Sequence, residues 1–444
     1  MKILIIGGIA AGMSTAAKAR RENKEAHITV VEMEDYISFG ACGLPYYLGG
    51  QFTDENEMFA RSVQQMQDQG INILTKHKAV ALNTEEKCIS VENLQDNSII
   101  QVPYDRLMIA TGASPILPPI EHIHADNVYT MTKLDAVKKL RDNLDQYETI
   151  GVVGGGFIGI EIAEQLAKLN KKIKLIHSPK VLMNYPFDLE ISMKIEEAMK
   201  DVGVEVITGQ RVQRMDAETN LVTKLHTQDY QFDVDAVVYA VGFKPNTDFL
   251  KGHLDMMDNG AIYINQYGQT SQEDIFAAGD CATIPHKFLG DQYIPLATYA
   301  NKMGRIIGTN IVKDQSHWLS YKDVLGTSAV KAGHYEAVVT GITEKDAIAI
   351  GLDIKTTLIE TNNHPSYYPN QEPILIKLVY DAQTHVLYGA QMFGKNDTVL
   401  RATGYTTAIH AGLKTEDIGF IDYAYSPPFS STWEALNVAA NTAK

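Results

Sequence analysis

The sequence predicts an α/β protein, and three observations support this fold class. A glycine-rich turn at residues 7–12 lies between a short apolar run and a segment with helical periodicity, and a second such turn lies at residues 154–159. Between about residue 322 and residue 444, two segments with strand-like runs are followed by one helical segment. At 444 residues the chain is too long for one ordinary hydrophobic core, so we expect about three domains.

The composition argues against several classes of function. A formal net charge of −15 disfavours nucleic acid or an anionic membrane as the main partner. The three cysteines have no regular spacing, so we expect neither a disulfide framework nor a metal site, and a reducing cytoplasm is the expected location. The chain begins MKILIIGG, a strand followed by a turn, and has no apolar run that approaches a membrane span. We therefore expect neither export nor membrane insertion.

The first glycine-rich turn has the features of a dinucleotide-binding motif. Gly7 permits a tight turn after the apolar run, and Gly12 lets the following helix pack closely on the strand. The helix N-terminus attracts a pyrophosphate, and Glu32, at the end of the second strand, can accept hydrogen bonds from a ribose. Ile9 replaces the middle glycine of the motif, so this turn alone is also consistent with an ordinary strand–turn–helix unit.

The second turn is a complete version of the same motif. The apolar run at residues 150–153 leads into Gly154-Gly155-Gly156-Phe157-Ile158-Gly159, and a helix over 160–169 and a strand over 172–177 follow. Two such units in one chain predict two Rossmann-like domains. They suggest two dinucleotides, of which one is permanently bound and the other exchanges.

The end of the strand at 172–177 bears on the second dinucleotide. Sites that prefer NADH usually have Asp or Glu at this position, which bonds the ribose diol and repels a 2′-phosphate. Here the position is His177, followed by Ser178 and Lys180. The absence of an acidic residue predicts a site that tolerates and favours NADPH over NADH. The alternative interpretation is that His177 is only a solvated strand end.

Further motifs carry a family resemblance. They are Ala110-Thr111-Gly112 after a strand, the run AVGFKPNT at 240–247, which contains Gly242, and Gly279-Asp280 in the run IFAAGDCA at 275–282. Together with the two turns they resemble the pyridine nucleotide–disulfide oxidoreductases, and within them the single-cysteine branch of coenzyme A-disulfide reductases, NADH oxidases and NADH peroxidases. The resemblance implies an FAD-dependent enzyme in which Asp280 binds the flavin ribitol.

The resemblance also implies a domain organisation. An FAD-binding domain is expected from two segments, 1–112 and 245–312, with an NAD(P)-binding domain at 113–244 between them. An α+β dimerisation domain is expected at 322–444, and the protein is then a homodimer. In this last part we expect strands and a helix over 397–419 that ends at a glycine.

Cys42, in the run SFGACGLPYY at 38–47, indicates which chemistry to expect. Dithiol enzymes of this kind have a second cysteine about five positions further on, where this chain has Tyr47. Cys88 and Cys281 lie in segments predicted to be a peripheral strand and a flavin-contact loop. The reaction partner of Cys42 is therefore expected to be external, either a small thiol or an oxygen atom held as a sulfenic acid. The segment GLPYYLGG predicts a helix whose N-terminus favours the Cys42 thiolate.

A few residues favour disulfide chemistry over oxygen chemistry. Oxidases and peroxidases of the family typically carry a histidine in the first glycine turn, where this chain has Ala10. The sequence Tyr425-Ser426-Pro427-Pro428 and the residue Tyr367 resemble tyrosines that reach from the partner subunit toward the redox cysteine. The expected substrate is coenzyme A disulfide or a similar small disulfide. An NAD(P)H oxidase or peroxidase that uses a Cys42 sulfenic acid is the main alternative; a persulfide reductase and a slow redox sensor also stay open.

Basic residues on the first helix are consistent with a phosphate-bearing substrate. Helical spacing places Lys18 and Arg21 on one face, although a solvated basic face is an equal alternative. Two positions depart from the reductase pattern, since Ala41 stands where Asn precedes the cysteine and Trp433 stands where a basic residue is expected.

The resemblance assigns a role to each remaining candidate. Cys42, Tyr425 and Tyr367 are the expected catalytic residues. The expected cofactor-binding residues are Gly7, Ile9, Ala10, Ala11, Gly12, Glu32, Ala110, Thr111, Gly112, Gly154, Gly156, Phe157, Ile158, Gly159, Glu161, His177, Ser178, Gly242, Gly279, Asp280 and Ala297. The expected substrate-binding residues are Ser14, Lys18, Arg21 and Ser38.

Overall fold

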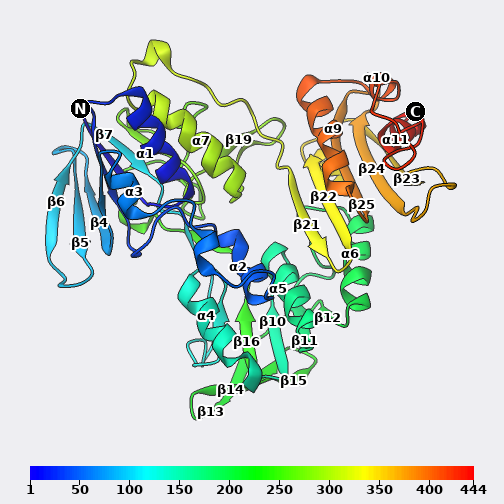
Figure 1. Cartoon of the computed structure of the whole chain (residues 1–444), viewed down its shortest axis with the longest axis horizontal. Helices are drawn as coiled ribbons and strands as arrows, with labels where there is room; N and C mark the ends of the chain where they lie inside the picture. The colour runs from blue at the N-terminus through cyan, green and yellow to red at the C-terminus, as the bar shows by residue number, and fades with distance from the viewer. The chain divides into compact units, whose positions relative to one another are not determined.

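A computed structural model describes all residues from 1 to 444 (Figure 1). The chain divides into two units. The first contains residues 1–43, 52–115 and 243–324, and the second contains residues 44–51, 116–242 and 325–444. The second unit thus holds most of the expected NAD(P) domain together with the C-terminal segment. The finer division into three domains stays a prediction.

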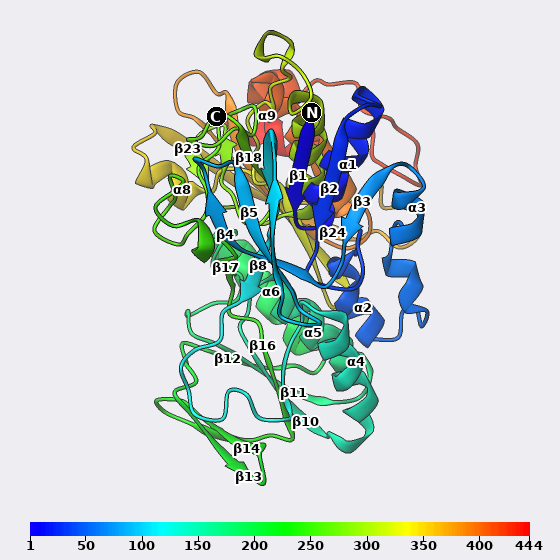
Figure 2. The same ribbon diagram turned by 90° about the vertical axis from the view of Figure 1, so that its left-hand side faces the viewer.

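The centre of the first unit is a five-stranded parallel sheet. Its strand order is β18-β7-β1-β2-β3, and Figure 2 shows β1, β2 and β3 beside one another. The strands are β1 (Lys2–Ile6), β2 (His27–Val31), β3 (Ile71–Leu74), β7 (Arg106–Ile109) and β18 (Ile275–Ala277). The continuous apolar runs of β1 and β7 are buried, as expected for a parallel sheet covered on both faces.

Two helices of this unit pack closely against each other (Figure 1). They are α1 (Ala10–Glu22) and α7 (Ala297–Asn310). A Cβ atom on Gly304 would lie 2.4 Å from the carbonyl oxygen of Ala11, so only glycine allows this approach. The Thr15 hydroxyl also donates a hydrogen bond to the Gly304 carbonyl at 2.9 Å. This packing holds the start of α1 at the carboxyl edge of the sheet.

Smaller elements complete the first unit. An antiparallel sheet in the order β4-β5-β6 is built from β4 (His77–Asn83), β5 (Cys88–Asn93) and β6 (Ile99–Pro103). The others are α3 (Val63–Gln67), β8 (Ala113–Pro115), β17 (Phe243–Pro245), β19 (Ile284–His286) and β20 (Gly290–Gln292).

The second unit contains another parallel sheet of the same design. Its strand order is β12-β11-β10-β16-β9. The strands are β9 (Val128–Thr130), β10 (Thr149–Val153), β11 (Lys172–His177), β12 (Glu205–Thr208) and β16 (Ala236–Tyr239). The helices are α2 (Leu44–Leu48), α4 (Leu134–Asn143), α5 (Phe157–Lys168) and α6 (Leu189–Asp201). A small antiparallel sheet is formed by β13 (Arg214–Glu218), β14 (Leu221–His226) and β15 (Gln231–Asp233).

The C-terminal segment forms an antiparallel sheet with helices. The strand order is β21-β22-β25-β24-β23. The strands are β21 (Ser328–Ala332), β22 (Tyr335–Gly341), β23 (Ile354–Asn362), β24 (Pro373–Asp381) and β25 (Leu387–Gly394). The helices are α8 (Glu344–Ala349), α9 (Thr398–Ala411), α10 (Thr415–Ile418) and α11 (Ala435–Thr442).

The predicted fold class is confirmed, but one predicted helix is wrong. The two parallel sheets with glycine-rich turns and the C-terminal α+β segment are present. The single helix expected over 397–419 is instead two helices, because Gly412 adopts a left-handed conformation, with φ of 68°, and ends α9. No helix is both long and apolar enough to cross a membrane.

Candidate active site

The first glycine-rich turn brings two strand ends and the start of a helix together. Gly7 has a φ of +106°, and a Cβ atom there would lie 2.0 Å from the carbonyl oxygen of Ala110, which follows β7. A Cβ atom on Gly12 would lie 1.8 Å from the Gly7 carbonyl oxygen. Only glycine fits at either position, so the sequence forces β1, the start of α1 and the end of β7 into contact.

Glu32 closes this turn from the neighbouring strand. It follows β2, it is buried, and its Oε2 accepts a hydrogen bond from the Gly8 amide at 2.6 Å. The same carboxylate accepts another from the Glu34 amide at 2.9 Å through Oε1. These two bonds orient the carboxylate at the edge of the turn, where it can also accept from a ribose.

The start of α1 fits an anionic group. The N-cap residue, Ile9, makes no side-chain capping bond, and the first turn, which includes Ala10 and Ala11, has no acidic residue. The first amides of the helix therefore have no side-chain acceptor from the cap. A pyrophosphate satisfies such amides and is stabilised by the positive end of the helix.

The other half of this site lies after β18 and at the start of α7. A Cβ atom on Gly279 would lie 3.3 Å from the Ala11 side chain, so the two turns touch. Burial, which no hydrogen bond offsets, raises the pKa of the Asp280 carboxyl. A half-buried carboxylate of this kind fits the hydroxyls of a polyol such as ribitol. Thr111, Gly112 and Ala297 lie in the same loops, after β7 and at the start of α7.

Tyr293 is a candidate that the sequence did not reveal. Its hydroxyl is buried and makes no hydrogen bond. Burial, together with the nearby charge of Asp280, raises its pKa. A buried, unsatisfied phenol hydroxyl near the half-buried Asp280 carboxylate indicates room for a polar ligand group. The residue lies between β20 and α7 with no motif around it, so only the tertiary structure identifies it. The residues of the first unit therefore fit FAD.

The second unit repeats the arrangement. Gly154 has a φ of +116°, and a Cβ atom there would lie 2.2 Å from the Ala240 carbonyl oxygen. A Cβ atom on Gly159 would lie 1.8 Å from the Gly154 carbonyl oxygen. Helix α5 begins at Phe157 and Ile158 with the N-cap Gly156, which has open space around it and no side-chain capping bond. Gly242 follows β16 at the same edge. This turn fits a second dinucleotide.

His177 takes the place that Glu32 occupies in the first unit. Its Nδ1 accepts a hydrogen bond from the Gly155 amide at 2.9 Å, as the Glu32 carboxylate does from Gly8. The ring proton is therefore on Nε2, which lies 3.3 Å from Oδ1 of Asn184. Burial lowers the pKa of His177, so the imidazole is neutral at pH 7. Ser178 follows it and is exposed.

Glu161, on the first turns of α5, is half-buried and has a perturbed acidity. Burial raises the pKa of its carboxyl to about 7, while a hydrogen bond from the Tyr46 hydroxyl, at 3.2 Å, opposes the shift. Tyr46 lies on α2 and was not among the predicted residues. Its position four residues after Cys42 gave no signal, because tyrosines in short helices are common.

We expect Glu161 to make stability depend on pH. Between about pH 4.5 and about pH 7 the unfolded chain has released a proton that the folded chain still holds, so stability falls through this window and levels off above it. Glu161→Gln stays neutral and should remove up to about 3 kcal/mol of this loss. Thermal unfolding of both proteins from pH 4 to pH 9 measures the difference.

The matched control is Tyr46→Phe. It removes the bond that favours the ionised carboxylate, so the midpoint of the pH dependence should move above about 7. An unchanged pH dependence in Glu161→Gln contradicts the assignment.

Cys42 is exposed and lies in a short 3-10 turn, Ala41–Gly43. The helix that follows it, α2, has only five residues, Leu44–Leu48. The helix expected in the segment GLPYYLGG is therefore present, but it is short, and its effect on the Cys42 thiolate stays a prediction.

The other cysteines of the first unit do not reach solvent. Cys88 is buried at the start of β5, and Cys281 is buried after β18. Burial raises the pKa of the Cys281 thiol to about 11. The structure contains no disulfide. Of the three thiols, Cys42 is the exposed one.

The structure brings the two predicted tyrosines together. The hydroxyls of Tyr367 and Tyr425 are 3.3 Å apart, although 57 residues separate the two in the chain. The hydrogen bond with Tyr425 raises the pKa of the Tyr367 phenol. Both side chains are exposed.

The four expected substrate-binding residues have different environments. Lys18 forms an ion pair with Glu22, and hydrogen bonds from Lys18 and Lys313 lower the pKa of Glu22 to about 2. Lys18 thus already has an anionic partner, which it shares with Lys313, and this weakens the case for a phosphate contact. Arg21 is exposed on the same helix.

Ser14 and Ser38 are both half-buried. The Ser14 hydroxyl donates a hydrogen bond to Oδ1 of Asn301 on α7 at 3.0 Å. Ser38 has a left-handed backbone, with φ of 53°, and its amide donates to the Gly8 carbonyl. Ser38 thus connects the Cys42 segment to the first glycine-rich turn.

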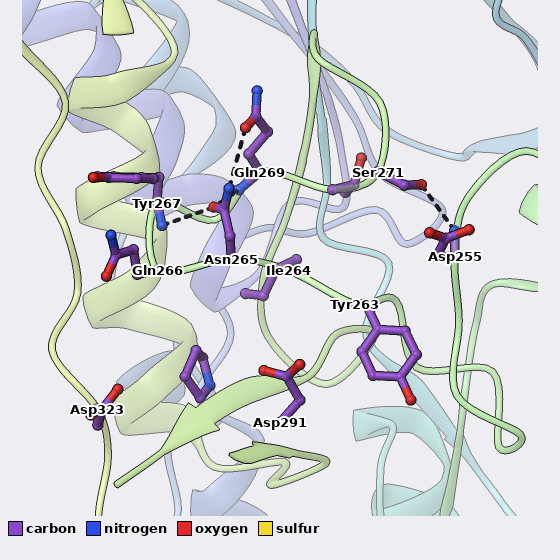
Figure 3. Close-up of a pocket in the computed structure, with 12 residues that line it drawn as sticks. Asp255, Tyr263, Ile264, Asn265, Gln266, Tyr267, Gln269, Ser271, Asp291 and Asp323 are labelled. Carbon is purple, nitrogen blue, oxygen red and sulfur yellow. Dashed lines mark hydrogen bonds between the residues drawn. The ribbon is translucent and has the colours of Figure 1, made fainter. Parts of the chain in front are cut away.

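A separate depression of about 650 Å³ lies elsewhere on the first unit (Figure 3). Its polar walls are held by local bonds, such as that from the Tyr267 amide to the Asn265 side chain at 3.0 Å. It is lined by Asp255, Tyr263, Ile264, Asn265, Gln266, Tyr267, Gln269, Thr270, Ser271, Pro285, Asp291 and Asp323. None of these is an expected site residue, and none is a nucleophilic thiol.

Two dinucleotide folds and an exposed cysteine define a class of protein, the flavin-dependent NAD(P)H oxidoreductases. The comparison with known families agrees with this class. The family model described as pyridine nucleotide-disulphide oxidoreductase matches residues 1–304, and the model of the family's dimerisation domain matches residues 327–436. The chain belongs to the pyridine nucleotide-disulphide oxidoreductase family.

Similar proteins have different activities. An NADH oxidase of Enterococcus faecalis is 33% identical over 445 residues, which is 100% of this chain and 99% of that protein. An NAD(P)H coenzyme A polysulfide/persulfide reductase of Pyrococcus horikoshii is 33% identical and covers 100% of this chain and 98% of that protein. The crystal structure of reduced Bacillus anthracis CoADR-RHD has a TM-score of 0.94 and 31% identity, over 99% of this chain and 79% of that one.

Proposed function

We propose that this protein reduces coenzyme A disulfide, or a related small disulfide, with NAD(P)H through FAD and Cys42. One observation carries the proposal: Cys42 is exposed, whereas the other two cysteines are buried. The sulfur that exchanges with Cys42 then comes from the substrate. The likeness to a coenzyme A polysulfide/persulfide reductase and to CoADR-RHD supports this substrate class.

FAD, when bound, accepts two electrons as hydride from NAD(P)H and makes them available to a disulfide. The residues Gly7–Gly12, Glu32, Thr111 and Asp280 would hold it. Residues 154–159, with Phe157 covering the nicotinamide site until it binds, would hold NAD(P)H. Glu161 would store a proton near the nicotinamide.

Cys42 is proposed to carry the substrate covalently. In the resting state its Sγ forms a mixed disulfide with one coenzyme A. Two electrons that originate from NAD(P)H cleave this bond, which releases coenzyme A and leaves the Cys42 thiolate. The thiolate then attacks a new coenzyme A disulfide, so that one sulfur bonds to Cys42 and the other leaves as a thiolate and takes up a proton. Each cycle consumes one NAD(P)H, one proton and one disulfide and yields two thiols.

Tyr425 and Tyr367 are proposed to act on the leaving sulfur. A phenol donates a hydrogen bond or a proton to a thiolate. In a homodimer, which the dimerisation domain supports, these tyrosines would serve the Cys42 of the partner subunit.

The proposed pyridine nucleotide is NADPH. His177 is neutral and its Nδ1 is occupied by the Gly155 amide, so no negative charge repels a 2′-phosphate at this strand end. The exposed residues Ser178 and Lys180, which follow it, can donate to such a phosphate.

We expect the change of His177 to Glu and Ser178 to Ala to lower the preference for NADPH. A carboxylate beside the 2′-phosphate costs binding energy, so the ratio of kcat/KM for NADPH to that for NADH should fall by at least about tenfold. His177→Gln, which is neutral and keeps an acceptor for Gly155, is the matched control and should preserve the ratio. Steady-state kinetics with both nucleotides measures the ratio. If the wild type and both variants have the same ratio of kcat/KM, position 177 does not determine the preference for NADPH.

The main alternative is an NAD(P)H oxidase or peroxidase that uses a Cys42 sulfenic acid. The identity with the Enterococcus faecalis NADH oxidase favours it. The absence of an imidazole at Ala10 disfavours it.

Two measurements separate the alternatives. The intact mass of the purified protein, with and without dithiothreitol, should show a reducible coenzyme A adduct on Cys42. Turnover with coenzyme A disulfide under anaerobic conditions should exceed the consumption of oxygen or peroxide. An adduct of one or two oxygen atoms, together with faster oxygen consumption, establishes the oxidase instead.

A further inference from the structure

Two loops of the C-terminal segment present the tyrosine pair. The loop at residues 363–372 joins β23 to β24 and carries Tyr367, and the loop at 422–433 leads into α11 and carries Tyr425. The side chains of Tyr367 and Tyr425 are 71% and 48% exposed. Within the subunit little packing fixes such rings, so the 3.3 Å separation of their hydroxyls depends on how the two loops are held.

Arg401, on α9, bonds to both loops. Its Nη2 donates to the carbonyl oxygen of Asn363 at 2.8 Å and also to the carbonyl oxygen of Phe429. Asn363 lies four residues before Tyr367, and Phe429 lies four residues after Tyr425. One guanidinium therefore connects the two loops close to the residues that they present.

Glu434 holds the other side of the guanidinium. Arg401 Nε donates to Glu434 Oε1 at 2.6 Å, and the two side chains are only 12% and 9% exposed. Glu434 is the N-cap residue of α11 and accepts from the Leu436 amide at 2.5 Å. The guanidinium is thus fixed between a helix start and two loop carbonyls.

The first loop is itself well bonded. The ring nitrogens of His364 lie 3.2 Å from the Pro365 carbonyl oxygen and 3.1 Å from the Asn370 carbonyl oxygen. The Asn363 side chain accepts from the Glu372 amide at 2.9 Å. These bonds stabilise the conformation of the loop, so the bond from Arg401 to Asn363 helps to fix the position of the whole loop.

Lysine cannot replace Arg401 in this role. A guanidinium presents several donors in a fixed plane, whereas an ammonium is a single donor centre on a flexible stem. Arg401 is also the only arginine between residues 306 and 444. The other permanently charged cationic side chains of that segment are lysines.

We propose that Arg401 is a positioning residue that holds the two tyrosine loops in register for disulfide reduction. This inference rests on the proposed function, because it assigns the effect of Arg401 to Tyr367 and Tyr425. Its consequence is selective: the loss of Arg401 slows the disulfide half of the cycle and leaves the reduction of the flavin by NAD(P)H unchanged.

The test compares Arg401→Met and Arg401→Lys with Lys395→Met in the full-length holoprotein. Lys395 is the matched control, because its Nζ reaches Glu372 of the first loop at 3.2 Å and has no bond to the second. Hydrogen exchange should become faster in both loops of Arg401→Met, and kcat with coenzyme A disulfide should fall by about 10- to 100-fold. Arg401→Lys keeps the charge opposite Glu434, so its kcat should lie between that of Arg401→Met and that of the wild type. Lys395→Met should affect neither the second loop nor kcat by more than about twofold.

A combined variant separates positioning from general destabilisation. If Arg401 acts through the two tyrosines, adding Arg401→Met to a variant that carries both Tyr367→Phe and Tyr425→Phe should not lower kcat further. Effects that multiply overturn the inference, as does unchanged hydrogen exchange in either loop. Rapid-mixing measurements of flavin reduction by NAD(P)H should give the same rate in all variants, and a rate that falls with kcat also overturns it.

The tyrosine variants distinguish failure of the role proposed for the tyrosines from failure of the positioning role of Arg401. If Tyr425→Phe and Tyr367→Phe keep full turnover, the tyrosines have no role in the reaction, and the inference that Arg401 positions them for catalysis fails with that role. If these variants are slow but Arg401→Met is not, the proposed function stands and the positioning role of Arg401 is excluded.

Discussion

Cys42→Ser should abolish turnover of coenzyme A disulfide while FAD stays bound and NAD(P)H still reduces it. The hydroxyl of serine cannot form a disulfide, and the remaining thiols, Cys88 and Cys281, are buried. We expect kcat to fall by at least about 1,000-fold, because the covalent route is lost rather than weakened. The measurements are disulfide turnover by steady-state kinetics and flavin reduction by rapid-mixing absorbance.

Cys88→Ser is the matched control for this prediction. Cys88 lies in the same unit at the start of β5, and its thiol contacts the Gln101 side chain at 3.4 Å. Its replacement should leave turnover within about twofold of the wild type. Full disulfide turnover in Cys42→Ser would falsify the single-thiol mechanism, and loss of turnover in Cys88→Ser would show that a second thiol takes part.

Gly7→Ala should cause the largest loss of cofactor and stability. At a φ of +106° any side chain is strained, which costs about 1–3 kcal/mol, and the Cβ atom would also lie 2.0 Å from the Ala110 carbonyl oxygen. Either β7 or α1 must move, and both border the expected pyrophosphate site. We expect at least a tenfold loss of FAD affinity, measured by the ratio of flavin to protein absorbance after dialysis and by thermal unfolding.

Gly203→Ala separates the two causes. Gly203 also has a positive φ, of +85°, but a Cβ atom there meets nothing within 4 Å. Its replacement should cost only the backbone strain, about 1–2 kcal/mol, and leave FAD binding intact. Equal loss of FAD in the two variants contradicts the steric argument at Gly7.

The preference at the second nucleotide site depends on one feature that is visible in the sequence and one that is visible only in the structure. The absence of an acidic residue at position 177 was visible in the sequence, and it led to the expectation about NADPH. The sequence did not reveal that the His177 ring accepts a bond from the Gly155 amide and is thereby held neutral. The structure thus assigns the ring proton to Nε2 of a neutral His177, and the proposed variants at this position test the effect on NADPH binding.

The helix predictions succeeded and failed for identifiable reasons. The helix expected with the first glycine-rich turn and the strand expected at 172–177 follow from local sequence patterns, and both are present. The helix over 397–419 was extended too far, because the pattern continues through Gly412 while the backbone does not. The helix expected after Cys42 is present, and the apolar segment between the glycines provides five helical residues.

By itself the sequence determined the two dinucleotide folds and the expected place of the reactive thiol. A tight turn between strand and helix needs glycines at fixed local spacing, so residues 7–12 and 154–159 disclose it without any distant contact. Only the tertiary structure decided which side chains work together. The Tyr46–Glu161 bond joins residues 115 apart, and Arg401 bridges two loops that are 66 residues apart at the carbonyls it binds. Such contacts depend on how loops and helices pack in space, and a contact between two side chains far apart in the chain has no local sequence pattern.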